Sequence, residues 1–180
     1  AYCWGFNAYG TIGDGSTTNR FRPSAVQQAA LMFRNVASGY MHTCAATSAG
    51  AAYCWGYNDY GQVGDGSTSH RTTPVSVSGL SGVAGVTAGT YHCCAWTATG
   101  PGYCWGYGRP GALGDGTWTT WPSPVQVSLV PRFSALSAGG FHTCGITSGG
   151  EVRCWGHGDY GQVGAGDWTG RSQPTLVPGV

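Results

Sequence analysis

The chain has 180 residues, a net charge of +1, 33 Gly, 9 Pro, 8 Cys and 8 Trp, and only 8% of its residues are charged. This length suits one domain or part of a repeat array, the many Gly and Pro residues disfavour long helices, and no apolar run approaches the roughly 20 residues of a membrane-spanning helix. All eight basic residues are Arg and lie scattered along the chain, so the basic stripe that nucleic-acid binding requires is absent.

A unit of about 50 residues repeats along the chain, and such periods indicate a repeat architecture. The sequence Tyr-Cys-Trp-Gly begins at Tyr2, Tyr53 and Tyr103, and Arg-Cys-Trp-Gly begins at Arg153. Gly and Pro residues follow each copy at fixed spacing. A Gly-x-x-His sequence precedes the last three copies and ends at His42, His92 and His142.

Each unit reads as short strands separated by Gly-rich turns. In the second unit, in chain order, a first extended segment at 36–37 leads into Gly39 and a second is expected over 42–47. A turn at 48–50 follows, then a third strand over 52–56, a Gly-rich stretch that reaches Gly66, and a last extended segment over 74–77. Four short antiparallel strands per unit predict an all-β fold built of β-propeller blades.

The residues of this motif resemble a known family. The sequence Tyr-Cys-Trp-Gly-Tyr-Asn-Asp-Tyr-Gly-Gln-Val-Gly-Asp-Gly at 53–66, with Gly-x-x-His-Thr upstream, is similar to the RCC1 repeat, named for the regulator of chromosome condensation. The resemblance covers essentially the whole chain and implies a propeller of about seven four-stranded blades. It implies much less about function, because one fold hosts many activities.

The repeat divides the chain into about three and a half blades. We expect a half blade and connector at 1–33, followed by blades at 34–84, 85–134 and 135–180. Such a number cannot close a ring, and each blade needs neighbours to bury its faces. We therefore expect the 180 residues to be an excerpt of a longer propeller, or to be completed by neighbouring chains.

Three pairs of cysteines lie ten residues apart, on either side of a predicted hairpin turn. Because the members of a pair face one another on adjacent antiparallel strands, their Cα atoms should come within about 4.5–5.5 Å, which a disulfide accepts. We predict the disulfides Cys44–Cys54, Cys94–Cys104 and Cys144–Cys154. Each closes a loop of about eleven residues, worth roughly 2–3 kcal/mol in the chain-entropy model. Persisting disulfides indicate an oxidising compartment, so we expect a secreted or cell-surface protein.

Cys3 and Cys93 have no partner at this spacing and are expected to be unpaired or intermolecular. Cys93 occupies the repeat position of Thr43 and Thr143, so it should face away from the Cys94 bridge. It is interpreted either as a small buried thiol or as the partner of Cys3 or of another chain.

A zinc site made by His42, Cys44 and Cys54 is the alternative to the first disulfide. The sequence lacks a Cys-x-x-Cys motif and a fourth ligand in each unit, so we expect no metal and no cofactor. The recurrent histidines are instead expected to hydrogen-bond a neighbouring blade. The motif tryptophans are expected to pack between blades; they are Trp4, Trp55, Trp105 and Trp155.

Two positions at which the units differ suggest a binding surface. Packing common to all blades does not require Trp there, and exposed Trp and Arg are frequent anchors at interfaces. The alternative is that these rings fold back over the blade edge. The candidate binding rim consists of Trp118, Trp121, Trp168, Arg20, Arg71 and Arg171.

The sequence favours a protein that is not an enzyme. It has one Glu and no nucleophile elbow, phosphate loop or paired-carboxylate signature. We expect a non-catalytic secreted or cell-surface propeller that acts as a binding module for a protein or glycan. The alternative is a structural subunit of an extracellular assembly or filament, in which neighbouring chains complete the blades. The expected partners are thus a protein, a glycan or copies of the chain itself, without nucleic acid.

Overall fold

The computed structural model describes residues 1–28, 30–130 and 132–180, and in these ranges it contains fourteen β-strands and no helix. The strands form one two-stranded and three four-stranded antiparallel sheets. The first sheet pairs β1 (Tyr2–Gly5) with β2 (Arg20–Ala25). The second sheet contains β3 (Phe33–Ser38), β4 (His42–Thr47), β5 (Ala52–Gly56) and β6 (Arg71–Ser76).

The two remaining sheets repeat the order of the second. The third sheet contains β7 (Val83–Ala88), β8 (His92–Thr97), β9 (Gly102–Gly106) and β10 (Trp121–Gln126). The fourth contains β11 (Phe133–Ala138), β12 (His142–Thr147), β13 (Val152–Gly156) and β14 (Arg171–Leu176). In each sheet consecutive strands are neighbours, so the all-β prediction of four-stranded antiparallel blades is confirmed.

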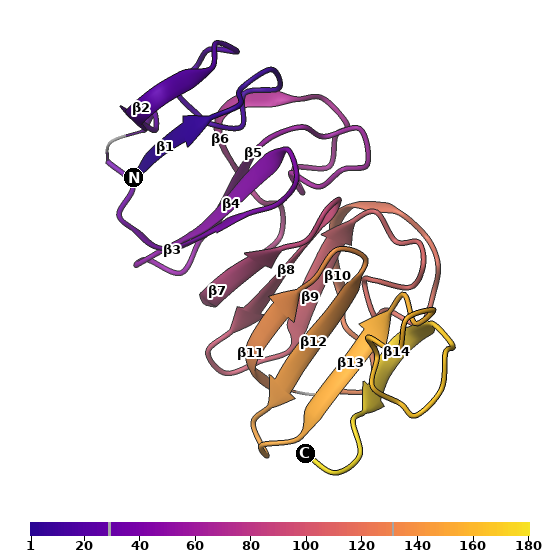
Figure 1. Cartoon of the computed structure of the whole chain (residues 1–180). Helices are drawn as coiled ribbons and strands as arrows, with labels where there is room; N and C mark the ends of the chain where they lie inside the picture. Colours follow the sequence, from indigo (N-terminus) through magenta and orange to yellow (C-terminus); the bar gives the residue numbers. More distant parts are fainter. Residues whose placement is uncertain (29, 131) are drawn as a thin grey trace.

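The sheets follow one another along an arc, in the order of the sequence (Figure 1). The first strands of the complete sheets, β3, β7 and β11, lie against one another on the inner side of this arc. The last strands, β6, β10 and β14, lie on the outer side because the strand order within each sheet follows the chain. These first strands begin at Phe33, Val83 and Phe133, one or two residues before the boundaries expected from the repeat.

Tryptophans of the motif join neighbouring blades. The side chains of Trp55, Trp105 and Trp155 are 0% exposed. The indole Nε1–H of each donates to a carbonyl of the preceding blade, at 2.8–2.9 Å; the acceptors are Thr11, Gln62 and Ala112. This arrangement confirms the packing role expected for the three residues.

The Gly-rich loops leave space for these indoles. Gly64 has a φ of +76°, and a Cβ atom at this position would lie 2.6 Å from Nε1 of Trp105. A side chain at Gly64 would therefore be both strained and in collision with the ring that holds the next blade. The repeated glycine is thus a packing requirement between blades.

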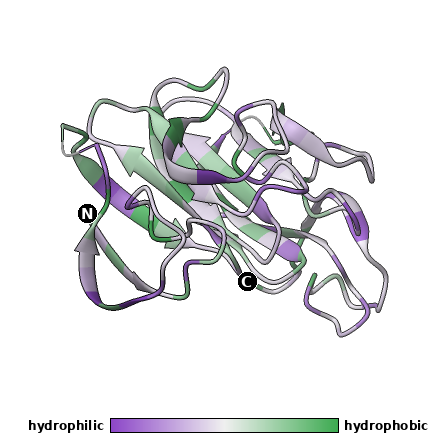
Figure 2. Cartoon of the chain, turned by 90° about the horizontal axis from the view of Figure 1, so that it is seen from above, coloured by the Kyte–Doolittle hydropathy of each residue, from purple (hydrophilic) through white to green (hydrophobic). Residues whose placement is uncertain are grey.

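The chain is of intermediate hydropathy, because few of its residues are charged and many are glycine. Figure 2 shows pale colours over most of the chain, interrupted by short hydrophilic and hydrophobic segments. None of the described segments forms a helix long and apolar enough to cross a membrane.

Disulfides connect the two central strands of each complete blade. Directly opposed cysteines of the paired strands are bonded, with Cα atoms 4.0–4.1 Å apart. The bonded pairs are those expected from the ten-residue spacing: Cys44–Cys54, Cys94–Cys104 and Cys144–Cys154. Each bond therefore fixes one hairpin within one blade.

Candidate interaction surface and cysteine cluster

Two loops of every blade lie at the same end of the sheet. In a meander of four strands, the first and third connections leave at one end and the second at the other. The Gly-x-x-His loop at 39–41 therefore lies on the same side as the long Gly-rich loop at 57–70. We call this side, with the equivalent loops of the other blades, the loop face.

A continuous row of aromatic rings crosses the loop face. Neighbouring rings along the row have centroids 4.9–6.4 Å apart, and the row passes from one repeat to the next through all four repeats. Tyr60, for example, packs at 5.2 Å from Tyr91 and 4.9 Å from Tyr107. We call this row the aromatic ridge; it consists of Tyr9, Tyr57, Tyr60, Tyr91, Tyr107 and Phe141.

The aromatic ridge was not predicted from the sequence. Its residues recur in several units, so the repeat pattern marks them as structural, and only the structure shows that their rings meet across blades. Tyr60 and Phe141 are nevertheless exposed. Tyr40, which is also exposed, widens the ridge by packing its ring 5.9 Å from that of Tyr91.

A buried asparagine holds the loop that carries two ridge residues. The side-chain amide of Asn58 donates to the carbonyls of Ser67 and Ser69, and its Oδ1 accepts from the backbone N–H of Val63 at 2.8 Å. Because Asn58 is completely buried, these bonds link both ends of the loop in a protected environment. The ridge is therefore presented by an ordered scaffold.

Tyr57 stays protonated as part of the same surface. Its hydroxyl donates to the carboxylate of Asp59 at 2.9 Å. Burial of the phenol and this hydrogen bond raise the pKa of Tyr57 to about 12. Tyr57 therefore presents a neutral ring and hydroxyl group at physiological pH.

Arginines of the candidate rim form ion pairs at the first position of the outer strands. The guanidinium groups of Arg20, Arg71 and Arg171 lie 2.6 Å from carboxylates of the preceding loop, those of Asp14, Asp65 and Asp167. Burial alone would raise the pKa of Asp14, but hydrogen bonds from Ser16 and Arg20 lower it to about 2. These arginines thus have a role in the loop itself.

Trp121 replaces the arginine in the second complete blade and keeps the contact. Its indole Nε1–H donates to Oδ2 of Asp115 at 3.0 Å. The replacement explains why a tryptophan occurs at this repeat position. It also accounts for the absence of a guanidinium beside Asp115 in the described structure.

The other rim tryptophans border two separate hollows. Trp118 lines a groove of about 470 Å³ between the third and fourth sheets, together with Arg153, Arg171 and Gln173. Trp168, which is 71% exposed, borders another hollow beside Gly161. The structure therefore brings Trp118 and Arg171 together and places Trp168 beside a separate hollow of the same blade as Arg171. Arg20 and Arg71 belong to other repeats.

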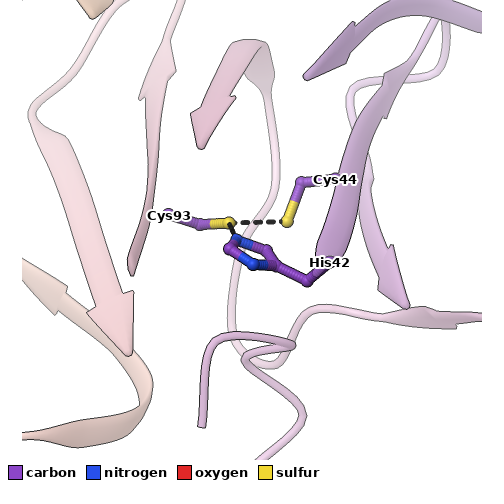
Figure 3. Close-up of side chains that lie close together, drawn as sticks. All are labelled: His42, Cys44 and Cys93. Atoms are coloured by element: carbon purple, nitrogen blue, oxygen red, sulfur yellow. Dashed lines mark hydrogen bonds between the residues drawn. The ribbon is translucent and has the colours of Figure 1, made fainter. Parts of the chain in front are cut away.

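His42, Cys44 and Cys93 form a buried cluster between two blades. Figure 3 shows His42 and Cys44 on one strand, β4, with Cys93 of the neighbouring sheet opposite. Sγ of Cys93 lies 3.1 Å from Nε2 of His42 and 2.8 Å from Sγ of Cys44. Burial lowers the pKa of His42 to about 4 and raises the pKa of Cys93 well above its usual range.

The cluster contains residue types that bind soft metals. However, Sγ of Cys44 is bonded to Cys54, so His42 and Cys93 are the two donors left in the cluster. Two donors are fewer than the three or four protein ligands of zinc sites. The zinc interpretation of His42, Cys44 and Cys54 would require the disulfide to be reduced.

Cys3 and Cys93 are both free thiols. Cys3 is half-buried on β1, where burial raises its pKa. Cys93 is completely buried and faces the disulfide of the preceding blade instead of the Cys94 bridge. The bond between Cys3 and Cys93 that the sequence left open is therefore not formed in this structure.

The histidine at the start of β8 repeats the contact across the next pair of blades. Nε2 of His92 lies 2.9 Å from Oγ1 of Thr143. The structural role expected for the recurrent histidines is thus confirmed for His42 and His92, both of which reach the following blade.

Comparisons with known proteins agree with this architecture. The chain matches the profile of the family described as "Regulator of chromosome condensation (RCC1) repeat" over residues 1–46, 49–96 and 102–146. The ultraviolet-B receptor UVR8 of Arabidopsis thaliana is 35% identical over 77 residues, which are 42% of this chain and 18% of the receptor. The E3 ubiquitin-protein ligase HERC2 of Homo sapiens is 37% identical over 82 residues, which are 45% of this chain and 2% of the ligase.

Solved structures show the same fold at lower identity. Human WBSCR16 superposes with a TM-score of 0.86 at 24% identity, over 98% of this chain and 48% of that one. Yeast RCC1 (Prp20), solved in complex with Kap60, gives a TM-score of 0.81 at 22% identity, over 98% of this chain and 44% of that one. This chain thus spans less than half of each solved chain. Because the repeat profile matches most of its residues, the chain belongs to the RCC1 repeat family.

Proposed function

We propose that this chain is a non-catalytic interaction module that binds a protein partner through the aromatic ridge on its loop face. The observation that carries the proposal is the continuity of the ridge, whose rings pack across all four repeats. Tyrosines supply large, rigid contact area, and aromatic residues are enriched at the centres of protein interfaces. The ordered loops reduce the entropy lost on binding.

The chemistry of the ridge favours a protein over a strongly charged ligand. Its members are tyrosine and phenylalanine rings with few charged side chains beside them, which resembles the centre of a protein interface. Yeast RCC1 (Prp20), which shares the fold, was solved bound to a protein, Kap60. A protein partner of this chain would use the ridge as its central anchor.

A glycan is the second candidate ligand class, and the groove beside Trp118 supports it. An indole face can stack on a sugar ring, while Arg171 and Gln173 in the same groove can hydrogen-bond hydroxyl groups. None of the residues that line the groove belongs to the aromatic ridge. Substitutions in the ridge should therefore weaken binding of a protein, and substitutions in the groove should weaken binding of a glycan.

We place the module in an oxidising compartment, on the cell surface or outside the cell. The supporting observation is the set of three disulfides within the blades. Such bonds are rare in the reducing cytosol. The proposed partner is accordingly a secreted or surface protein.

The alternative function is a structural subunit of an extracellular assembly. Trp4 is 61% exposed, whereas the equivalent Trp55, Trp105 and Trp155 are 0% exposed because each packs on a preceding blade. A blade supplied by another copy of the chain could cover Trp4 in the same way. This candidate differs from the first in requiring self-association.

A matched set of variants tests the ridge. The double variant Tyr60→Ala/Phe141→Ala removes two exposed ridge rings, and Phe21→Ala removes a ring that is 93% exposed on β2 as a control. The wild type and both variants are immobilised and exposed to a secreted-protein fraction from the source organism and to a glycan array. Thermal unfolding first establishes that all three are equally folded.

We expect a protein retained by the wild type and by Phe21→Ala to bind the ridge variant at least tenfold more weakly, since hot-spot aromatics contribute about 1–2 kcal/mol or more each. Equal retention by all three proteins would overturn the ridge as the binding site. Array binding that survives in the ridge variant and is lost in Trp118→Ala would assign the ligand to the groove and to the glycan class.

A further inference from the structure

We propose that Cys93 and the Cys44–Cys54 disulfide form an intramolecular thiol–disulfide exchange site, which transfers the bond to Cys44–Cys93 and so links two blades covalently. The two blades are the second and third sheets, and no disulfide joins them among the residues that the structure describes. This inference concerns residues remote from the loop-face ridge and does not depend on the proposed function.

The geometry supplies the attacking group and its target. Sγ of Cys93 lies 2.8 Å from Sγ of Cys44, closer than two non-bonded sulfur atoms usually come. Both side chains are completely buried, so no other thiol reaches the bridge as readily. Figure 3 shows the two sulfur atoms directed toward one another.

His42 is positioned to accept the proton of the Cys93 thiol. Its Nε2 lies 3.1 Å from Sγ of Cys93, and its Nδ1 has no hydrogen-bond partner among the described residues. A histidine beside a cysteine is the usual means of generating a thiolate nucleophile. Nε2 can take the proton of Cys93 when Nδ1 carries the ring hydrogen. Because burial makes the ring a weak base, this transfer is slow.

The exchange is balanced without any external oxidant. The Cys93 thiol passes its proton to Nε2 of His42, and the resulting thiolate attacks Sγ of Cys44. The Cys93–Cys44 bond forms as the Cys44–Cys54 bond breaks, and the electron pair of the broken bond stays on the sulfur of Cys54, which takes the proton. One disulfide and one thiol are present before and after. Burial disfavours the thiolate, so we expect exchange over minutes to hours.

The next blade interface serves as an internal comparison. There Thr143 occupies the position of Cys93, and its hydroxyl donates to the carbonyl of Ala112 at 2.9 Å while contacting His92. The nearest disulfide sulfur, Sγ of Cys94, lies 3.9 Å from that hydroxyl. Cys93 has thus replaced a hydrogen-bonding threonine with the one residue type that can exchange with the adjacent bridge.

The transferred bond would change what the disulfide holds together. Cys44 and Cys54 are separated by 10 positions within one hairpin, whereas Cys44 and Cys93 are separated by 49 and belong to different sheets. A longer closed loop removes more entropy from the unfolded chain. The exchange therefore replaces a disulfide within one blade by a disulfide between two blades.

Trypsin provides a direct readout, because cleavage after Arg71 separates Cys44 and Cys54 from Cys93. The native protein is incubated, its free thiols are alkylated under denaturing conditions, and the digest is analysed by mass spectrometry without reduction. The resting pairing leaves fragments 35–71 and 72–132 separate, whereas the exchanged pairing joins them. All proteins carry Cys3→Ser, so that Cys3 cannot attack another molecule.

We expect joined fragments and alkylated Cys54 to appear with incubation, and Cys93→Thr to abolish both. Cys54→Ser, folded in a glutathione buffer, should contain the Cys44–Cys93 bond as its main product. The matched variant Cys104→Ser should keep Cys94 free, because Thr143 faces it.

Two results would overturn the proposal. Separate fragments at every incubation time of the parent protein would exclude exchange, even if Cys54→Ser forms the Cys44–Cys93 bond. Joined fragments that persist in Cys93→Thr would assign the linkage to other cysteines.

Discussion

At the scale of single residues, two buried imidazoles connect the blades and make stability sensitive to pH. The hydroxyl of Thr143 donates to Ala112, so Nε2 of His92 must carry the hydrogen that it donates to Thr143. Burial lowers the pKa of His92 to about 3 and that of His42 to about 4. Both rings are therefore neutral in the folded protein at physiological pH.

Stability should fall as the pH is lowered from 7 to 5. Histidines of the unfolded chain bind protons below about pH 6.5, whereas these two rings of the folded protein do not. Below that pH, each histidine therefore lowers the free energy of unfolding by about 1.4 kcal/mol for every unit by which the pH falls. The loss from His42 ends near pH 4, its pKa in the folded protein. Urea unfolding at pH 7, 6 and 5 measures the slope.

Substitution of His92 tests the assignment of this slope. His92→Gln keeps a donor for Thr143 but cannot titrate, so its slope should be smaller than that of the wild type by the contribution of one histidine. His70→Gln, at a partly exposed position, is the control. An unchanged slope in His92→Gln would contradict the role given to burial.

Among the strands, the second and third of each complete blade are joined by a disulfide that stabilises the blade. The bridges are not equally protected, because Cys144 is only half-buried, whereas the cysteines of the first two bridges are 0% exposed. A reductant attacks a sulfur atom that it can reach. The bridge between β12 and β13 is therefore the most accessible one.

Limited reduction of the native protein should break Cys144–Cys154 before the other two bridges. The double variant Cys144→Ser/Cys154→Ser should lose roughly 2–3 kcal/mol of stability, the value for a loop of this length. Alkylation after brief treatment with a phosphine reductant, followed by peptide mapping, identifies the bridge that opens first. Earlier labelling of Cys94 or Cys104 would show that burial does not control the order.

At the scale of the whole molecule, the exposed Trp4 distinguishes the two proposed functions. The assembly candidate predicts a mass above 18.6 kDa in light scattering, which rises with concentration and returns toward that value in Trp4→Ala. Phe21→Ala, which removes another exposed ring of the first sheet, is the control. A constant mass of one chain at all concentrations would exclude self-association and leave the binding module.

Local features of the fold were predictable from the sequence because hairpins depend on neighbouring residues. The expected segments 42–47 and 52–56 coincide with β4 and β5. The last strand was placed too late: it was expected over 74–77, whereas β6 spans Arg71–Ser76. The difference arises where the pairing shifts between Cys54 and Gly56, since Gly56 already pairs with Arg71.

Candidate sites were predictable only in part, because they combine side chains of different repeats. The rim position stood out because Trp121 interrupts a recurrent arginine. The ion pairs of those arginines with loop carboxylates appeared only in the structure. The aromatic ridge was not predicted, because nothing in the spacing within one unit shows that these rings meet across blades. Contacts such as Tyr60 to Tyr107 depend on the rotation between adjacent blades.

The repeat, the blade and the cysteine pairs follow from the order of the amino acids, because each depends on spacing within about 50 residues and on local turn chemistry. The contact of Cys93 with the disulfide of the preceding blade became evident from the folded chain, as did the single ridge formed by rings from four repeats. These contacts lie across blade interfaces. Their geometry depends on how the buried tryptophans of one blade pack against the preceding blade, and spacing within a single unit does not describe that packing.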